Sequence, residues 1–332
     1  MVAAATAAGQ IASRDLGPRP VRIRVTHLTT AANLWATPLA LDFRRRHIVG
    51  VSIGLIDFRV GVIVTIRHYY RGIAMQNFDR PVYAPYARSM DMSVDQGLRS
   101  FMLGVFNYMA LGVALTGLAA YLVASLAVTG DASQAAARIG QNTYLTEFGR
   151  LVFVSPLKWV LMLAPLGFVF ALSAGFERFS TSTLQLLFWL FCGVMGVSMG
   201  TIFLVYKLGS IVQVFFMTGA SFAALSLWGY TTKRDLTGMG NFLFMGLIGI
   251  VIAGLVNLFL ASSALQFAIS CIGILVFAGL TAFDTQRLKE SYYDGLELGE
   301  VQKLSIAGAL SLYLNFINMF QMMLSLFGNR ND

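Results

Sequence analysis

The chain has 332 residues, of which 57% are hydrophobic and only 12% are charged, and its mean hydropathy is +0.69. Soluble globular domains carry about 25% charged residues, so this composition excludes a soluble enzyme, a disordered tail protein and a disulfide-stapled secreted domain. Three stretches contain no Asp, Glu, Lys or Arg, and each can cross a bilayer core of about 30 Å as a helix. The sequence therefore predicts an all-α integral membrane protein. The uncharged stretches lie between Arg99 and Asp131, between Asp235 and Asp284, and between Lys303 and Arg330.

The formal net charge of +8 comes almost entirely from one end of the chain. Residues 1–74 hold ten arginines, no lysine and three aspartates, a net charge of +7, and they also hold all three histidines. The apolar body therefore has neither the basic surface that binds nucleic acid nor a histidine base or ligand. Cys192 and Cys271 are isolated within apolar stretches and do not have the spacing of a metal-binding pair. We expect no nucleic-acid partner, no enzyme, no catalytic residue, no cofactor and no tightly bound metal.

Residues 1–74 differ in character from the rest of the chain. Their only long apolar stretch is interrupted by Asp57 and Arg59, which are costly near the centre of a membrane helix. An Arg-rich, Lys-free segment is typical of a mitochondrial transit peptide or of a basic strip that is attracted to anionic lipid. Translation that begins at Met75 is the alternative, because the residues after it match the body of the chain. We expect residues 1–74 to be an extension that is disordered or not translated, and residues 75–100 to be a cytoplasmic N-terminal tail.

Seven membrane-spanning helices are expected after this tail. Ser93 and Gln96 have the spacing of a capping box at the start of the first. Ser155 and Pro156 open the second, and Pro165 is expected to kink it. Longer apolar stretches are divided where polar or charged residues predict a turn, near 207–209 and at 262–263. The expected spans cover about 101–127, 155–174, 183–206, 209–230, 240–261, 264–286 and 304–327.

Basic residues in the flanking segments indicate how a membrane protein is oriented, because Lys and Arg are enriched on the cytoplasmic side. With residues 1–74 and the interfacial Lys158 left aside, the segments on the side of the N-terminal tail carry nine Lys and Arg, against four on the other side. This distribution predicts a cytoplasmic N-terminus and a C-terminus on the outer side.

Small residues at helical spacing occur in two of the expected spans. Gly196 and Gly200 form a GxxxG pattern, and Gly249 and Ala253 form a similar pair. Such pairs let helices approach closely, either within one bundle or across a dimer interface, so we expect a monomer or a weak homo-oligomer. Gly196 to Gly200 also matches the G-x-S-x-G pattern of hydrolases, but that motif requires a strand-to-helix turn and a later histidine, and the sequence offers neither.

Polar residues inside a membrane are costly and are functional candidates by default. Asp284 is the strongest candidate, although it can also simply mark the inner membrane interface. The last expected span carries a second polar cluster. Its amides are spaced three or four residues apart and share a helical face, so they either line a path or hydrogen-bond neighbouring helices. The cluster consists of Tyr313, Asn315, Asn318 and Gln321.

Four stretches of the chain resemble the Bax inhibitor-1 family in its bacterial YccA-like branch. They are GYTTKRDL at 229–236, the glycine-spaced segment 238–249, GLTAFDTQ at 279–286 and GALSLYLNFIN at 308–318. The resemblance covers about residues 90–330 and implies a seven-transmembrane-helix bundle with the last helix central, acting as a proton-sensitive calcium leak. It also implies a pH-sensing pair of aspartates from helices six and seven. Asp284 falls on the first position of this pair, but the second position, where many members have Asp, is Asn315.

The resemblance therefore predicts a pH-modulated calcium or cation leak channel in which Asp284 and Asn315 sense pH and gate the path. An amide lacks the like-charge repulsion of a second carboxylate, so the departure at residue 315 predicts a weaker or shifted pH dependence. Calcium prefers several oxygen ligands, and we expect it to be a permeant ion without a tight site. The further candidates for the cation path are Asn318, Gln321, Tyr313 and Gln286.

The resemblance also allows a function from another class. Some bacterial relatives are associated with a membrane-anchored FtsH-type AAA protease, which would make this chain an interaction protein that uses its tail at 75–98. Membrane lipid is the other expected partner. The expected location is the bacterial inner membrane, with the mitochondrial inner membrane as the alternative.

Overall fold

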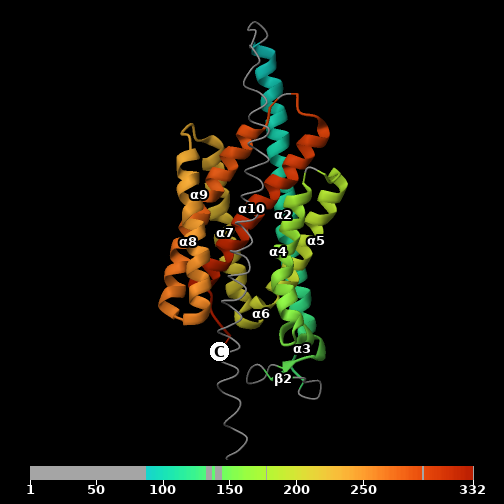
Figure 1. Cartoon of the computed structure of the whole chain (residues 1–332), viewed down its shortest axis with the longest axis vertical. Coiled ribbons are helices and arrows are strands. Elements are labelled where there is room, and N and C mark those ends of the chain that lie inside the picture. Colours follow the sequence, from blue (N-terminus) through green and yellow to red (C-terminus); the bar gives the residue numbers. More distant parts are fainter. Residues whose placement is uncertain (1–86, 132–136, 139–143, 177, 294, 332) are drawn as a thin grey trace, which may run out of the picture. The chain divides into compact units, whose positions relative to one another are not determined.

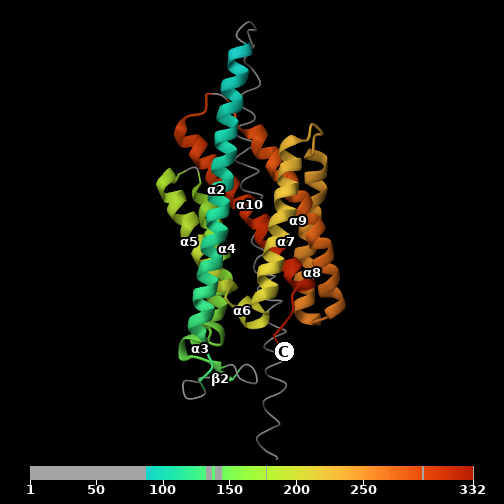
Figure 2. The ribbon, with the colours of Figure 1, turned by 180° about the vertical axis from the view of Figure 1, so that it is seen from behind.

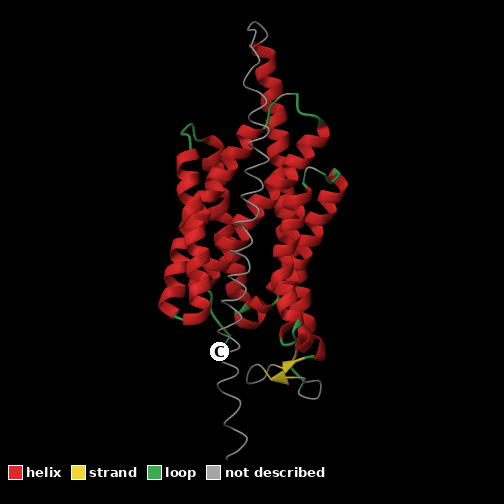
Figure 3. Ribbon diagram, viewed as in Figure 1, coloured by secondary structure: helices red, strands yellow, loops and turns green. Residues whose placement is uncertain are grey.

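A computed structural model describes residues 87–131, 137–138, 144–176, 178–293 and 295–331. The expected extension 1–74 and the adjoining tail up to residue 86 lie outside the described residues. Helices account for most of what is described (Figure 3). The helices are α2 (Ala87–Ala127), α3 (Glu147–Phe153), α4 (Leu157–Gly175), α5 (Thr181–Met199), α6 (Thr201–Val205), α7 (Leu208–Thr231), α8 (Thr237–Leu260), α9 (Ser263–Ser291) and α10 (Leu298–Phe327).

Three short strands lie in the chain between α2 and α3. They are β1 (Val128–Thr129), β2 (Ala137–Arg138) and β3 (Tyr144–Leu145). The strands form a small antiparallel sheet in the order β1-β3-β2.

The described helices are long and apolar enough to cross a membrane six times. The pair formed by α3 and α4 passes the same test together, with a bend of 59° between its two helices, and gives a seventh crossing if it is counted as one span. The prediction of an all-α membrane bundle of about seven spans is confirmed. Each expected span coincides with a helix of the structure, and most of the ends agree within a few residues. In chain order, the seven expected spans correspond to α2, α4, α5 together with α6, α7, α8, α9 and α10.

Helix α10 lies in the centre of the bundle. It crosses obliquely between α7, α8 and α9 on one side and α2, α4 and α5 on the other, as two opposite views show (Figures 1 and 2). In its most apolar 18-residue segment, 83% is buried, far more than in the same segment of any other described span. The mean hydropathy of this span, 1.3, is nevertheless the lowest of the six. Polar side chains are costly in lipid, so the span with most amides and hydroxyls is surrounded by other helices.

The start of α2 differs from the expectation. The described part of α2 already runs from Ala87, upstream of Ser93 and Gln96, so these two residues lie inside a helix and the predicted capping box is wrong. No proline interrupts 87–100, and helix propagation is favourable once a helix has formed. The spacing of a capping box alone therefore did not identify the helix start.

Of two other predicted helix starts, the one at 262–263 is correct, whereas α4 begins at Leu157, one residue later than predicted, with Pro156 and not Ser155 at the cap position. The Leu157 N–H donates to Ser155 Oγ at 3.1 Å at the start of α4, and the Leu265 N–H donates to Ser262 Oγ at 3.3 Å at the start of α9. Helix α4 runs through Pro165 without interruption, and the 59° bend lies upstream of it, between α3 and α4.

Gly196 makes a close helix contact inside the bundle. A Cβ atom built at this position would lie 2.5 Å from the Thr116 carbonyl oxygen and 2.6 Å from the Ala119 Cβ, so α5 approaches α2 here as only a glycine allows. By contrast, Gly249 of α8 is exposed, and a Cβ there would meet no atom within 4 Å. The GxxxG pattern thus packs helices within one chain, while the second small-residue pair begins on the outer face of α8.

Candidate functional site

The buried carboxylate of Asp284 is the centre of the candidate site. It lies on α9, is 7% exposed, and faces two polar side chains of α10. Ser311 Oγ donates a hydrogen bond to Asp284 Oδ2 at 2.8 Å, and Asn315 Nδ2 donates to the same oxygen at 2.6 Å. The structure therefore brings together the two residues that the sequence assigned to gating, and adds Ser311.

Ser311 was not singled out from the sequence. It precedes Asn315 by four residues and therefore lies one turn away on the same helical face. That spacing was the available signal, but serine is common in membrane helices and usually bonds to its own backbone. Its contact with a carboxylate of another helix depends on how α9 and α10 pack.

Glycines allow the neighbouring helices to approach α9 closely on either side of Asp284. A Cβ built at Gly229 of α7 would lie 2.3 Å from the Ala282 carbonyl oxygen, and one at Gly240 of α8 would lie 2.4 Å from the Phe283 ring. A Cβ at Gly308 of α10 would meet the Leu288 side chain. The carboxylate is therefore enclosed because three helices pack tightly around this part of α9.

Two amides of α10 are not fully satisfied. Among the described residues, Asn315 Oδ1 and Gln321 Nε2 are buried and have no hydrogen-bond partner. Asn318 differs, because its Nδ2 donates at 2.7 Å to the Leu314 carbonyl of its own helix. Burying an unpaired polar group costs about 1–3 kcal/mol, and such groups are uncommon in native proteins. The free oxygen of Asn315 is thus an unused acceptor directly beside Asp284.

Tyr313, which the sequence made a candidate for the cation path, lies away from this cluster. Its hydroxyl is 2.7 Å from Thr116 Oγ1 of α2, and its ring packs edge-on against Phe188 and Phe191 of α5. Two residues along a helix correspond to a rotation of about 200°, so Tyr313 and Asn315 occupy nearly opposite faces of α10. Tyr313 therefore joins α10 to α2 and α5.

The side-chain amide of Gln286 forms two hydrogen bonds with backbone groups. Its Oε1 accepts from the Leu236 N–H at 2.8 Å, and its Nε2 donates to the Arg234 carbonyl at 2.7 Å. It therefore fixes the connection between α7 and α8 from the end of α9. In the same connection, hydrogen bonds from the side chain and backbone of Thr237 hold the pKa of Asp235 below its ordinary value.

Replacing Gln286 by leucine should destabilise the protein. The Leu236 N–H, at a residue only 5% exposed, would lose its acceptor, and an unsatisfied buried donor costs about 1–3 kcal/mol. We expect a lower melting temperature of Gln286→Leu in detergent micelles, measured by intrinsic fluorescence. Gln213→Leu is the matched control, because Gln213 is exposed on α7. Equal melting temperatures for the two variants would contradict the role given to Gln286.

Comparison with known proteins identifies the family. The model of the family described as "Inhibitor of apoptosis-promoting Bax1" matches residues 98–332. The chain belongs to the Bax inhibitor-1 family. The resemblance seen in the sequence is thereby confirmed, and the match spans every helix from most of α2 to α10.

Several bacterial proteins are similar to this chain over most of their length. An uncharacterized protein of Caulobacter vibrioides is 44% identical over 266 residues, which cover 78% of this chain and 100% of the relative. The inner membrane protein YbhL of Escherichia coli K12 is 42% identical over 236 residues, covering 70% of this chain and 93% of the relative. A membrane protein of Streptococcus pyogenes serotype M3 is 31% identical, with 72% and 96% of the two chains covered.

Proposed function

We propose that this protein is a cation leak channel that passes calcium and is modulated by pH. The observation that carries the proposal is the Asp284 carboxylate, which is held inside the bundle by Ser311 and Asn315 of the central helix. An ionisable group within a membrane bundle is costly to keep and commonly marks an ion or proton pathway.

The chemistry around Asp284 suits a weak cation site. Calcium takes six to eight oxygen ligands in tight sites. Here one carboxylate, the Ser311 hydroxyl and the unpartnered Asn315 Oδ1 supply fewer oxygens. A permeation site must bind weakly enough to release its ion, so this donor set favours passage over storage.

The described conformation corresponds to a closed path at Asp284. The carboxylate is 7% exposed, and both donors from α10 occupy its Oδ2 atom. A cation at this oxygen would have to displace the Ser311 and Asn315 donors. Opening therefore requires α9 and α10 to separate at this level.

The amide at residue 315 determines the expected pH response. Nδ2 can donate to an ionised Asp284, and after rotation of the amide Oδ1 can accept from a protonated one. The contact between α9 and α10 therefore survives a change in protonation. We expect calcium flux through this protein to depend less steeply on pH than flux through a member with two carboxylates.

The names of the relatives support an inner-membrane location, since YbhL of Escherichia coli is named as an inner membrane protein. We place this chain in a bacterial inner membrane with its N-terminus in the cytoplasm, from the distribution of basic residues between the flanking segments. This orientation can be tested with single cysteines introduced in the α7–α8 connection or in the α6–α7 connection. The measurement is the reactivity of each cysteine toward a membrane-impermeant reagent.

Calcium flux into proteoliposomes tests the proposed function. The full chain should pass calcium, and Asp284→Asn, which keeps the shape of the side chain and removes its charge, should reduce flux to that of empty liposomes. Glu147→Gln is the matched control, because Glu147 is exposed on α3 and pairs with Arg150 of the same helix.

Two results would contradict the proposal. Flux in Asp284→Asn equal to that of the native chain would show that this carboxylate does not control the path. Flux of the native chain equal to that of empty liposomes at every pH would exclude the leak and favour the interaction with an FtsH-type protease, which co-purification with and without the N-terminal tail would then test.

A further inference from the structure

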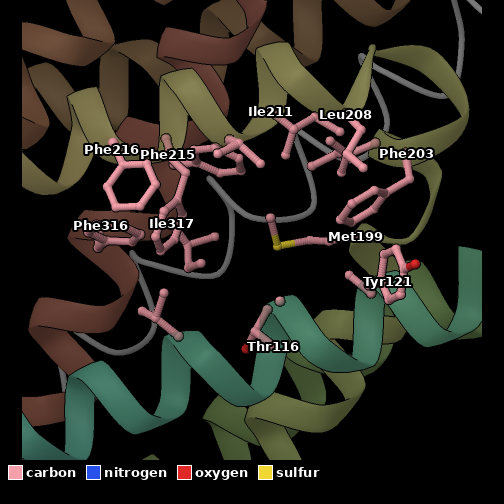
Figure 4. A pocket seen from close by; sticks show the side chains of 16 residues that line it. Thr116, Tyr121, Met199, Phe203, Leu208, Ile211, Phe215, Phe216, Phe316 and Ile317 are labelled. Atoms are coloured by element: carbon pink, nitrogen blue, oxygen red, sulfur yellow. The ribbon is translucent and has the colours of Figure 1, made fainter.

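An apolar groove lies between α2 and α7, away from the Asp284 site. Its volume is about 340 Å³, at the lower end of the roughly 300–1,000 Å³ of small-molecule sites. Figure 4 shows side chains of α2, α5, α7 and α10 turned toward this space. The Thr116 hydroxyl on the wall of the groove already forms hydrogen bonds with the Tyr313 hydroxyl and with backbone carbonyls. The groove therefore suits an apolar occupant.

The groove opens sideways, toward the surrounding bilayer. Its floor is formed by α10, where Phe316 is 4% and Ile317 is 3% exposed. Its rim is formed by α7, where Leu208 is 54%, Val212 is 46% and Phe216 is 69% exposed. Hydrocarbon from the bilayer can therefore enter the groove between exposed side chains and reach the central helix.

The shape of the groove fits a single chain of methylene groups. Along α7 its lining extends from Leu208 to Phe216, which corresponds to about 12 Å at a rise of 1.5 Å per residue. A helix with its side chains is about 10–12 Å wide and is too thick for a groove of this volume. An acyl chain that runs parallel to α2 and α7 is narrow enough.

Two basic residues lie at the end of the groove where α7 begins. Lys207 directly precedes Leu208 and is exposed. The Arg330 guanidinium lies over the Tyr206 ring, 6.0 Å from its centroid. Backbone hydrogen bonds join this connection to the C-terminal residues, from the Lys207 N–H to the Asn329 carbonyl at 2.9 Å and from the Asn331 N–H to the Val205 carbonyl at 2.8 Å. The C-terminal segment thus holds a second cation close to Lys207.

We propose that this groove binds an anionic phospholipid, with one acyl chain along α10 and the phosphate beside Lys207 and Arg330. Lys and Arg bind phosphate through charge-assisted hydrogen bonds, and basic residues at a membrane edge attract anionic lipids. The apolar wall of the groove then binds the acyl chain of the lipid, and the adjoining basic residues bind its headgroup. The bound acyl chain contacts Phe316, which is next to Asn315 in the sequence of α10.

Gly117 offers a way to block the groove without disturbing the fold. It lines the groove on α2, is exposed, and a Cβ at this position would meet no atom within 4 Å. Gly117→Phe therefore places a ring in the space proposed for the acyl chain. Gly249→Phe is the matched control, because Gly249 is also exposed with no atom within 4 Å, but lies on α8.

The test uses a phosphatidylglycerol with a photoreactive diazirine in its acyl chain. It is added at low mole fraction to phosphatidylcholine proteoliposomes that hold the full chain. After illumination, mass spectrometry of the digested protein should find adducts on the α10 segment 316–320. These adducts should fall about tenfold in Gly117→Phe and persist in Gly249→Phe. Replacing Lys207 and Arg330 together by glutamine should also lower them about tenfold, because each basic residue adds attraction to the anionic headgroup.

Three results would overturn the proposal. The first is a native chain that carries no adduct on 316–320. The second is equal labelling by photoreactive phosphatidylcholine, unaffected by loss of Lys207 and Arg330, which would mean that any bilayer lipid fills the groove. The third is crosslinking of the groove wall to a second copy of the chain in place of lipid. Circular dichroism and melting temperature of each variant show that the fold is retained.

Discussion

Replacing Asn315 by aspartate should convert a weakly pH-dependent calcium flux into a steeply pH-dependent one. In the native chain the amide is 2.6 Å from the Asp284 carboxylate and is neutral at every pH. In Asn315→Asp two carboxyl groups occupy this space and cannot readily both ionise. At acid pH they share a proton and hold α9 against α10, and when that proton is lost they repel.

The repulsion in Asn315→Asp would be large enough to open the proposed cation path. Two unit charges about 4 Å apart repel by roughly 4 kcal/mol at an effective dielectric constant near 20, and each 1.4 kcal/mol changes an equilibrium constant by about tenfold. Even if most of this energy is relieved by small movements, we expect flux to rise at least about tenfold from acid to alkaline pH. The measurement is calcium flux into proteoliposomes at a series of pH values.

The charge-swapped double variant is the sharpest control. Asp284→Asn combined with Asn315→Asp keeps one carboxylate and one amide in the same space but exchanges the helices that carry them. It should lack the steep response, because like-charge repulsion needs both carboxylates. A steep response in the double variant would mean that a carboxylate on α10 is sufficient by itself, and would contradict the pairing with Asp284.

Hydrophobicity alone located the membrane helices, because the energetic cost of charged residues in lipid limits where a chain can cross. It could not separate the roles of polar residues within one helix. Asn315 and Tyr313 are two residues apart in a buried helix, yet one contacts α9 and the other contacts α2 and α5. Which face meets which neighbour depends on how the helices are arranged around α10, and the periodicity of a helix that is buried on all sides does not reveal this.

The same limit explains Gln286 and the groove. Gln286 follows Asp284 by two residues and was assigned to the same path, but the α7–α8 connection lies on its side of α9 and takes up both ends of its amide. The groove is lined by residues from several helices that are far apart in the sequence. Each lining residue is an ordinary apolar residue of a membrane span, so no local pattern could indicate that a space exists between them.

Adding one methyl group at Gly229 should cause a marked loss of stability. A Cβ at this position would lie 2.3 Å from the Ala282 carbonyl oxygen and 2.9 Å from two further backbone atoms of Ala282. Backbone atoms cannot rotate away as a side chain can, so α7 would have to move away from α9. Overpacking of this kind costs about 1–3 kcal/mol and occasionally more. The shift would also loosen the packing two residues from Asp284.

Gly219 of the same helix provides the control with the opposite expectation. A Cβ there would meet no atom within 4 Å, and alanine is favoured over glycine within a helix by up to about 1 kcal/mol. Gly219→Ala should therefore leave the melting temperature in detergent unchanged or raise it, whereas Gly229→Ala should lower it. If both variants melted at the native temperature, α7 could move away from Ala282 of α9 at no cost, and the close packing of α7 would not be what encloses the Asp284 carboxylate.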